Sequence, residues 1–190
     1  MKLTPELLEW CYRGGAFPMA DPSGRVEFYR SDPRAILGLE DLRVTKSLAR
    51  VIRKGVYDVR VDEDFGAVIR ACADRRETWI NAEIIGAFIE LHRRGKAHSV
   101  EAYRDGKLAG GLYGVSLGGA FMGESMFTRA RDASKVCFVY LVERLKERGY
   151  VLLDCQIQNN HLRSLGATEI PEREYLRRLR QALKLDRSFV

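Results

Sequence analysis

The chain has 190 residues, of which 46% are hydrophobic and 31% are charged, which is the composition of a globular protein with one domain, or one domain and a small appendage. No apolar run approaches the roughly 18 residues that a membrane-spanning helix needs, and the first residues lack the layout of a secretory signal. We therefore expect a cytosolic protein without a membrane partner. The four scattered cysteines form no C-x-x-C pair, which argues against a zinc ribbon and a disulfide scaffold.

Basic residues exceed acidic ones by 32 to 26, and the excess is concentrated between Arg43 and Arg60. A helix is predicted over 45–54, ended by Gly55, with one apolar face. Its other face carries Lys46, Arg50, Arg53 and Lys54. Such a face is most often simply solvated; the alternative is a ridge that contacts phosphates.

The N-terminal part predicts a helix over 4–13, capped by Thr4, and then a stretch rich in Pro, Gly, Ser and Asp that is either a linker or a small loop-rich unit. Because about 30 residues cannot bury a core of their own, we expect residues 1–32 to form a small domain that leans on a main domain, residues 33–190.

Hydrophobic periodicity predicts the remaining elements. Asp105-Gly106 is a strong hairpin turn, so the strands around it form an antiparallel meander. The expected strands are 56–61, 98–104, 108–117, 120–127 and 150–157, and the expected helices are 62–73, 82–94, 132–148, 160–165 and 172–183.

Meander, buried helix, strand and helix, in this order, resemble the GNAT class of acyltransferases. The resemblance implies an α+β fold with a mixed, largely antiparallel sheet, splayed near its middle and flanked by helices. Enzymes of that class bind the pyrophosphate of acetyl-CoA with a Gly-rich loop before the buried helix. The corresponding residues here, 128–134, contain no glycine, so we expect no CoA, no other cofactor and a different acyl donor.

Two strands carry polar residues among apolar ones. Asp154 and Gln156 alternate with Cys155, so they are expected on one strand face with the cysteine on the other. They either tie down a neighbouring loop or form a site. Glu124 and Met126 are likewise expected on one face, where Glu124 either pairs with Arg129 or Lys135 or lies beside an apolar pocket with a raised pKa.

These segments and their neighbours resemble the leucyl/phenylalanyl-tRNA–protein transferase family over most of the chain. The matching blocks are Ser31-Asp32-Pro33-Arg34-Ala35, Thr78-Trp79-Ile80, His92 with Gly95, His98, Ser99 and Glu101, Gly110-Gly111-Leu112-Tyr113-Gly114-Val115, Gly123-Glu124-Ser125-Met126-Phe127 with Arg129, Asp132-Ala133-Ser134-Lys135, Leu153-Asp154-Cys155-Gln156, and His161 with Ser164-Leu165-Gly166-Ala167 and Glu169-Ile170-Pro171. The resemblance implies transfer of Leu or Phe (Met less well) from aminoacyl-tRNA to proteins that begin with Arg or Lys. It also implies that the product is marked for degradation and that the enzyme is a monomer.

The resemblance places the functional carboxamide at Gln156, its supporting carboxylate at Asp154 and a functional glutamate at Glu124. Our hypothesis is that Asp154 polarises Gln156, which accepts a hydrogen bond from the incoming amine. Glu124 would hold the ester or the terminal ribose, or attract the positive charge of the acceptor. An apolar pocket for the amino-acid side chain is expected from residues that could equally be ordinary core: Leu112, Phe121, Met126, Phe138 and Leu153.

Trp79 is the candidate for stacking on the terminal adenine of tRNA. The chain departs from the family pattern at Met19 and at Phe28-Tyr29, where the family often has Trp, so its amino-acid preference is left open. With the resemblance in hand, the basic helix is expected to contact tRNA phosphates.

Other interpretations compete with this one. They are a GNAT enzyme with another donor, the same reaction with another amino acid, and a tRNA-binding protein without activity. His92, His98 and His161 are too far apart in sequence to suggest a metal site, so structural hydrogen bonding is expected for them. Cys155 is not expected to act as a nucleophile, because it should point away from the Asp154 and Gln156 face.

Overall fold

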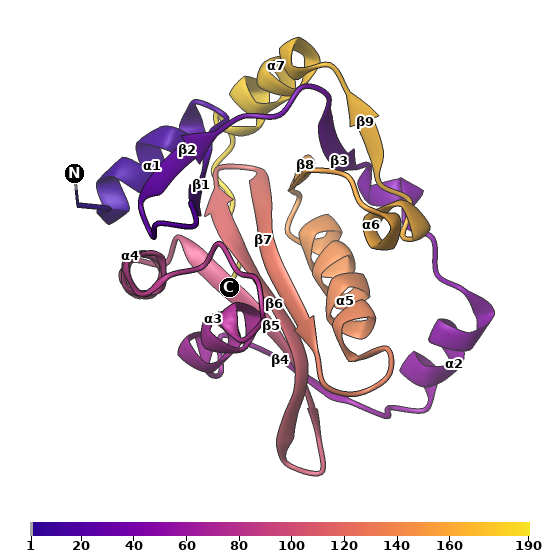
Figure 1. Ribbon diagram of the computed structural model, residues 1–190. Helices are drawn as coiled ribbons and strands as arrows, with labels where there is room; N and C mark the ends of the chain where they lie inside the picture. Colours follow the sequence, from indigo (N-terminus) through magenta and orange to yellow (C-terminus); the bar gives the residue numbers. More distant parts are fainter. Residues whose placement is uncertain (1) are drawn as a thin grey trace.

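The computed structural model describes residues 2–190, which form one seven-stranded sheet with helices on both faces (Figure 1). The strand order is β4-β5-β6-β7-β8-β3-β9, and every neighbouring pair is antiparallel except β7 and β8. The strands span Arg34–Leu37 (β3), Asp58–Val61 (β4), Ala97–Arg104 (β5), Lys107–Leu117 (β6), Ala120–Thr128 (β7), Leu152–Gln156 (β8) and Thr168–Ile170 (β9). This confirms the α+β, GNAT-like mixed sheet and the β5–β7 meander.

The parallel pair β7–β8 is short. It joins only Ala120, Phe121 and Met122 to Leu152, Leu153 and Asp154, and beyond these residues the two strands separate (Figure 1). The expected splay of the sheet therefore lies at β7 and β8, and Glu124 and Gln156 are each two residues beyond the last pair.

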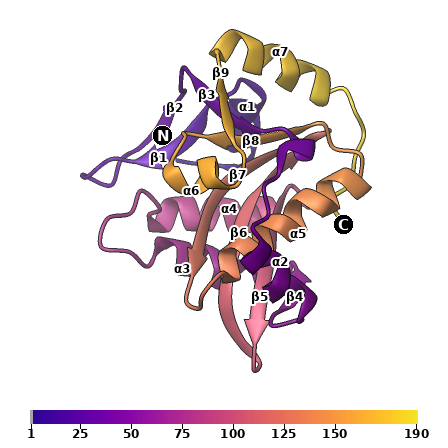
Figure 2. The same cartoon turned by 90° about the vertical axis from the view of Figure 1, so that its right-hand side faces the viewer.

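Helices α3 (Phe65–Ala73) and α4 (Ala82–Arg93) cover one face of the sheet, and α5 (Ala133–Glu147) covers the other. Helix α2 (Lys46–Arg53) packs beside α5, on the side that faces the viewer in Figure 2. The other helices are α1 (Pro5–Arg13), α6 (Asn160–Ser164), α7 (Glu172–Ala182) and a 3-10 turn at Leu39–Asp41.

Side-chain caps mark the N-terminal ends of α1, α2 and α4, but not that of α5. Thr4, Thr45 and Asn81 each accept a hydrogen bond from a backbone N–H of the first turn of their helices. Asp132 precedes α5 as predicted, but it has a left-handed backbone (φ 65°) and makes no such bond.

The breaker-rich stretch after α1 is an ordered hairpin and not a linker. Strands β1 (Phe17–Ala20) and β2 (Val26–Tyr29) pair antiparallel, with the turn residues between them. Tyr12 of α1 and Phe17 of β1 are buried in the same apolar cluster as Phe88 of α4. The division at residue 32 stays a prediction, but the N-terminal segment shares its core with the main sheet.

Gly110 of β6 lets α5 lie close to the sheet. A Cβ atom added at Gly110 would be 2.6 Å from the Cβ of Ala133 and 3.0 Å from the backbone nitrogen of Ser134. A side chain at position 110 would therefore push the first turn of α5 away from the sheet, which explains why a strand interior carries a residue that weakens strands.

A buried ion pair joins Arg34 of β3 to Asp154 of β8. Arg34 is 1% exposed and Asp154 is 0% exposed, and the guanidinium donates to both carboxylate oxygens at 2.9 and 2.7 Å. Arg34 also donates to the carbonyl oxygen of Gly15, and its guanidinium lies over the rings of Phe17 and Tyr175. The hydroxyl of Tyr175 donates to Asp154 at 2.8 Å, so one arginine links the N-terminal segment, β8 and α7.

We expect Arg34→Met to lower the free energy of unfolding by about 3–5 kcal/mol, because the Asp154 carboxylate stays buried without an opposite charge. Adding Asp154→Asn should recover part of the loss. Urea unfolding at pH 7 measures both, with Arg30→Met as the control, since Arg30 is exposed. A loss below about 1 kcal/mol for Arg34→Met would show that the pair does not hold the fold together.

Candidate active site

Both strands that separate carry a β-bulge at the point of separation. In β7, Gly123 pairs with Gly114 and Ser125 with Tyr113, which leaves Glu124 as the extra residue. In β8, Asp154 pairs with Ile36 and Gln156 with Ala35, which leaves Cys155 as the extra residue. A bulge breaks the alternation of side chains, and bulges commonly aim a side chain at a functional site.

The bulge in β7 corrects one prediction about Glu124. Glu124 and Met126 were expected on one strand face, but Met122 belongs to the apolar cluster on the α3–α4 side and Met126 packs against the cluster on the α5 side. The extra residue at Glu124 changes which face the following side chains occupy. It also keeps Glu124 from pairing with Arg129 or Lys135, since no ion pair of Glu124 occurs within residues 2–190.

Glu124 and Gln156 meet across the gap between the strands. The Nε2 of Gln156 donates to Oε1 of Glu124 at 2.5 Å. Gln156 has a left-handed backbone conformation (φ 59°), which is uncommon for a residue other than glycine and is held here by its neighbours. The hydrogen bond between these two side chains therefore connects β7 and β8 beyond the last residues that are paired through the backbone.

Asp154 acts on the backbone of Gln156 and not on its side chain. Its Oδ1 accepts a hydrogen bond from the backbone N–H of Gln156 at 2.9 Å, while its two oxygens are held by Arg34 and Tyr175. The expectation that Asp154 directly polarises the Gln156 carboxamide is wrong, because the bulge turns that carboxamide toward Glu124. Asp154 is a positioning residue that fixes the strained turn.

Burial raises the pKa of Glu124 to about 8. The neighbouring polar groups of Tyr12 and Gln156 oppose this shift without cancelling it. The Oε2 of Glu124 is shielded from solvent and has no hydrogen-bond partner within residues 2–190. At neutral pH the carboxyl is therefore mostly protonated.

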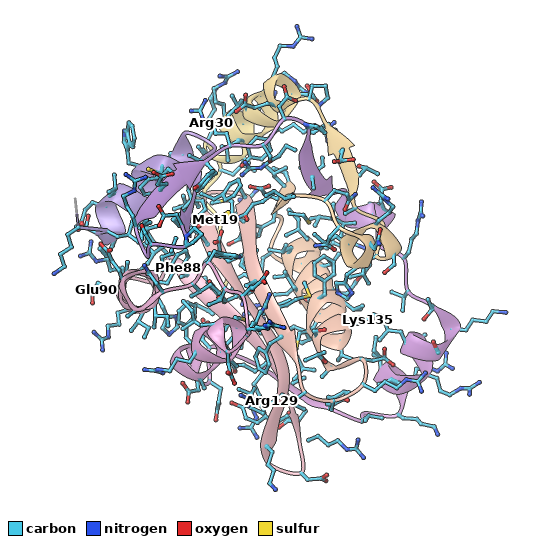
Figure 3. All side chains as sticks on the ribbon, viewed as in Figure 1. Met19, Arg30, Phe88, Glu90, Arg129 and Lys135 are labelled. Carbon is cyan, nitrogen blue, oxygen red and sulfur yellow. The ribbon has the colours of Figure 1, made fainter. Side chains whose placement is uncertain are left out.

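A cavity of about 260 Å³ opens where β7 and β8 separate. Leu112, Met126, Phe138, Leu141 and Leu153 give it an apolar wall. Glu124, Asp154 and Gln156 lie at its polar end, and Phe17 and Met19 border it from the N-terminal hairpin. Figure 3 shows Met19 between that hairpin and β7. An apolar hollow with a few converging polar groups is the usual form of a small-ligand site.

Most of the residues expected in the pocket line this cavity. Leu112, Met126, Phe138, Leu153 and Trp79 do so. Phe121 does not: it is fully buried, its ring centroid lies 5.1 Å from that of Phe189, and it lies where β7 still pairs with β8. Its place in the pocket is thus corrected to a place in the core.

The N-terminal departures from the family pattern divide into two kinds. Met19 borders the cavity, so it can influence what the cavity accepts. Phe28 and Tyr29 lie on β2 and are not among the lining residues.

Sequence reasoning missed several residues of the site. Cys155 lines the cavity, because the bulge sets it outside the alternation that would point it away. Burial raises the pKa of its thiol, which keeps it protonated and a poor nucleophile. His161 of α6 also lines the cavity, and its Nε2 is buried with no hydrogen-bond partner among the described residues, 2–190. Burial and the charge of Lys135 lower the pKa of His161. Arg34, Tyr175 and Arg75 were missed as well.

Lys46, Arg50 and Arg53 of α2, and Lys54 that follows it, are exposed, and none of them forms an ion pair within residues 2–190. A second hollow of about 310 Å³ lies next to them, and three arginines line it: Arg50 of α2, Arg104 at the end of β5, and Arg131 before α5. This hollow also contains Asp132, which lies 3.6 Å from Arg131. Figure 3 labels Arg129 and Lys135 at the same end of the molecule.

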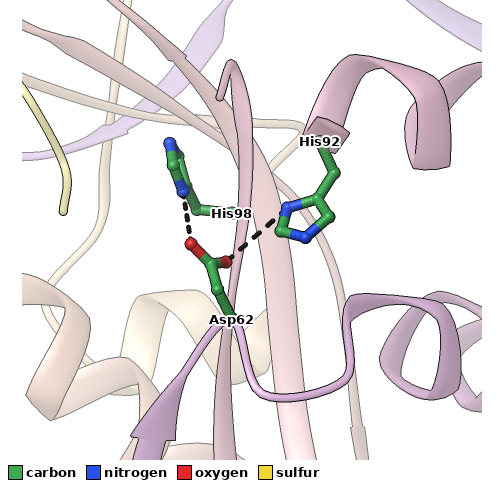
Figure 4. Close-up of side chains that lie close together, drawn as sticks. All are labelled: Asp62, His92 and His98. Atoms are coloured by element: carbon green, nitrogen blue, oxygen red, sulfur yellow. Dashed lines mark hydrogen bonds and ion pairs between the residues drawn. The ribbon is translucent and has the colours of Figure 1, made fainter. Parts of the chain in front are cut away.

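Two histidines that are apart in sequence lie together on Asp62 (Figure 4). One oxygen of Asp62 is 2.7 Å from Nδ1 of His98, and the other is 3.8 Å from Nδ1 of His92. Three potential metal ligands therefore lie close together. Their separation in the sequence gave no indication of this. The same nitrogens are already used, since Nδ1 of His92 is 2.8 Å from the carbonyl oxygen of Ala97. Asp62 also accepts from the backbone N–H of Ser99. The cluster fits a hydrogen-bond network that ties β4, β5 and α4 together.

Comparisons of this chain with known proteins point to one family. The family model described as leucyl/phenylalanyl-tRNA protein transferase matches residues 36–180, and the model of its N-terminal domain matches residues 1–32. A protein from Rubrobacter xylanophilus, named leucyl/phenylalanyl-tRNA--protein transferase, is 72% identical over all of both chains. One of the same name from Gloeobacter violaceus is 54% identical over 98% of this chain and 97% of its own.

Solved structures are more distant. L-PGS from Bacillus licheniformis aligns over 82% of this chain and 51% of its own, with 16% identity and a TM-score of 0.43. A tandem GNAT protein from the clavulanic acid biosynthesis pathway aligns over 87% of this chain and 65% of its own, with 14% identity and a TM-score of 0.41. No helix within residues 2–190 is both long and apolar enough to span a membrane.

The protein is thus an enzyme of the acyltransferase class. More specifically, the chain belongs to the leucyl/phenylalanyl-tRNA protein transferase family.

The raised pKa of Glu124 predicts a pH-dependent difference between the wild type and Glu124→Gln. The folded protein holds this proton up to a pH of about 8, whereas the unfolded chain loses it near the ordinary value of 4.5. The proton therefore stabilises the wild type fully below pH 4.5, and this contribution is lost as the pH rises toward 8. Glutamine does not titrate, so the variant should gain on the order of 4 kcal/mol relative to the wild type between pH 5 and pH 9.

Urea unfolding of both proteins across this range measures the difference. A difference that stays constant with pH would show that the Glu124 carboxyl is ionised in the folded protein.

Proposed function

We propose that this chain transfers Leu or Phe, and Met less well, from aminoacyl-tRNA to the α-amine of proteins that begin with Arg or Lys, marking them for degradation. The observation that carries the proposal is the bond between Gln156 and Glu124 at the polar end of an apolar cavity. Family membership supports the same reaction, since the relatives carry its name.

The cavity suits the donor's side chain. Leu112, Met126, Phe138 and Leu153 offer an apolar surface that Leu and Phe would fill, and flexible Met126 allows both shapes. A cavity of about 260 Å³ is large enough for one such side chain, so it would select the amino acid.

The reaction is aminolysis of an activated ester. The neutral α-amine of the acceptor attacks the ester carbonyl, a C–N bond forms, and the C–O bond to the terminal ribose breaks. The proton released by the amine goes to the departing ribose oxygen. No covalent enzyme intermediate is required, and orientation with charge stabilisation supplies most of the acceleration.

Gln156 and Glu124 have complementary roles. Because the Nε2 of Gln156 donates to Glu124, its amide oxygen remains free to accept a hydrogen bond from the incoming amine. The neutral carboxyl of Glu124 accepts from Gln156 and would hold that carboxamide beside the ester at the polar end of the cavity. Among the roles left open by the sequence, a neutral carboxyl favours a contact with the ester or ribose over attraction of a positive acceptor.

The RNA is held through its phosphates and through stacking. Trp79 lines the cavity and would stack on the terminal adenine. Lys46, Arg50, Arg53 and Lys54, with Arg104 and Arg131 around the second hollow, would contact the backbone without reading bases. The cytosolic location and the monomeric state of the protein stay predictions, and the mechanism requires neither.

We expect Gln156→Ala and Glu124→Ala each to lower the rate of Phe transfer to an Arg-starting peptide by about 100-fold, the scale of losing one group that stabilises a transition state. Transfer is measured with labelled Phe-tRNA in single-turnover conditions. Glu169→Gln, an exposed substitution on β9, is the control and should keep the wild-type rate. Folded variants that retain normal rates would end the assignment of both residues.

Binding of tRNA should weaken steeply with salt, because phosphate contacts release counterions. Replacing Arg50 and Arg53 with Gln should reduce the slope of log affinity against log salt by about 1–2 units. The control is Arg173→Gln with Arg180→Gln, two exposed arginines of α7, which lies at the other end of the molecule (Figure 1). Equal slopes for wild type and the α2 variant would show that α2 does not contact the RNA.

A further inference from the structure

Arg75 occupies an unusual position at the border of the active-site cavity. It lies in the segment between α3 and α4, four residues before Trp79, and both residues line the cavity. Its guanidinium reaches across to β7, where it donates to Oγ of Ser125 at 2.9 Å and to the carbonyl oxygen of Met126 at 2.5 Å. Ser125 is the neighbour of Glu124, so the charge of Arg75 is held beside the polar end of the cavity.

This charge is not neutralised by the protein. Both acceptors of Arg75 are uncharged, and Arg75 forms no ion pair with a carboxylate within residues 2–190. Arg34, the other arginine at the site, differs, because it is paired with Asp154. Because Arg75 is exposed, it is free to take an additional anionic partner.

The chemistry of the two substrates decides what that partner is. An acceptor that begins with Arg or Lys is positively charged and would be repelled by Arg75. The aminoacyl end of the donor carries no negative charge except on the phosphates of the RNA chain. A guanidinium is the side chain best suited to phosphate, since its planar donors match two phosphate oxygens.

We propose that Arg75 binds the phosphate on the 5′ side of the terminal adenosine of tRNA and so positions the ester in the cavity. This inference rests on the proposed function and adds a positioning residue to it. Since Arg75 and Trp79 belong to one segment, the phosphate and the adenine of the same nucleotide would be held by one loop. The loop is anchored to β7 next to Glu124 through Ser125 and Met126.

The test compares two non-reactive donor analogues, 3′-deoxy-3′-(phenylalanylamino)adenosine with and without a 5′-phosphate. Calorimetric binding to the wild type should favour the phosphorylated analogue about tenfold, as expected for one charge-assisted hydrogen bond. Arg75→Ala should remove this preference and leave binding of the unphosphorylated analogue within about twofold of the wild type. Arg75→Lys should retain part of the preference, because it keeps the charge without the planar fork.

Arg76→Ala is the matched control: Arg76 is an exposed arginine of the same segment that does not line the cavity, and it should behave as the wild type. If Arg75→Ala weakens both analogues equally, Arg75 only supports β7, and the proposal is wrong. It is also wrong if the wild type does not distinguish the analogues. A phosphate preference that depends on Arg75, in a protein that transfers no amino acid, would support this site and refute the proposed function.

Discussion

The buried ion pair between Arg34 and Asp154 is the contact on which the site depends. A carboxylate without solvent would ordinarily take up a proton or destabilise the fold, so its two oxygens need strong donors. Arg34 and Tyr175 supply them, and the backbone N–H of Gln156 completes the set. The same arginine binds the carbonyl oxygen of Gly15, which ties the N-terminal segment to the strand that carries the site. Stability and the geometry of the site are therefore set by one group of contacts.

The strands β7 and β8 separate directly after Asp154, the residue that these contacts hold in place. Two bulges, at Glu124 and Cys155, end the regular pairing, and the side chains of Glu124 and Gln156 bridge the gap that the backbone leaves. On the α5 side the gap becomes an apolar cavity, while toward α1 it buries the carboxyl of Glu124. The raised pKa of Glu124 and the shape of the cavity thus have the same origin.

The sequence predicted the parts of the fold that repeat with a regular period. The meander around Asp105-Gly106, the buried helix α5 and the polar residues of β7 and β8 were recognised from alternation and helical spacing. Strands β1, β2, β3 and β9 were missed, because segments of three or four residues carry too little pattern. The bulges were missed because register depends on the partner strand. The partner of Asp154 lies 120 residues away, and no local pattern links a strand arginine to it. The family resemblance, and not periodicity, supplied the role of Gln156.

A crystal structure with bound 3′-deoxy-3′-(phenylalanylamino)adenosine tests the central claim most directly. We predict that the phenyl ring lies between Leu112, Met126 and Phe138, and that the carbonyl group of the analogue lies at the polar end of the cavity, beside the carboxamide of Gln156 that Glu124 holds. A ligand bound elsewhere, or a phenyl group that leaves the cavity between β7 and β8 empty, would contradict the account.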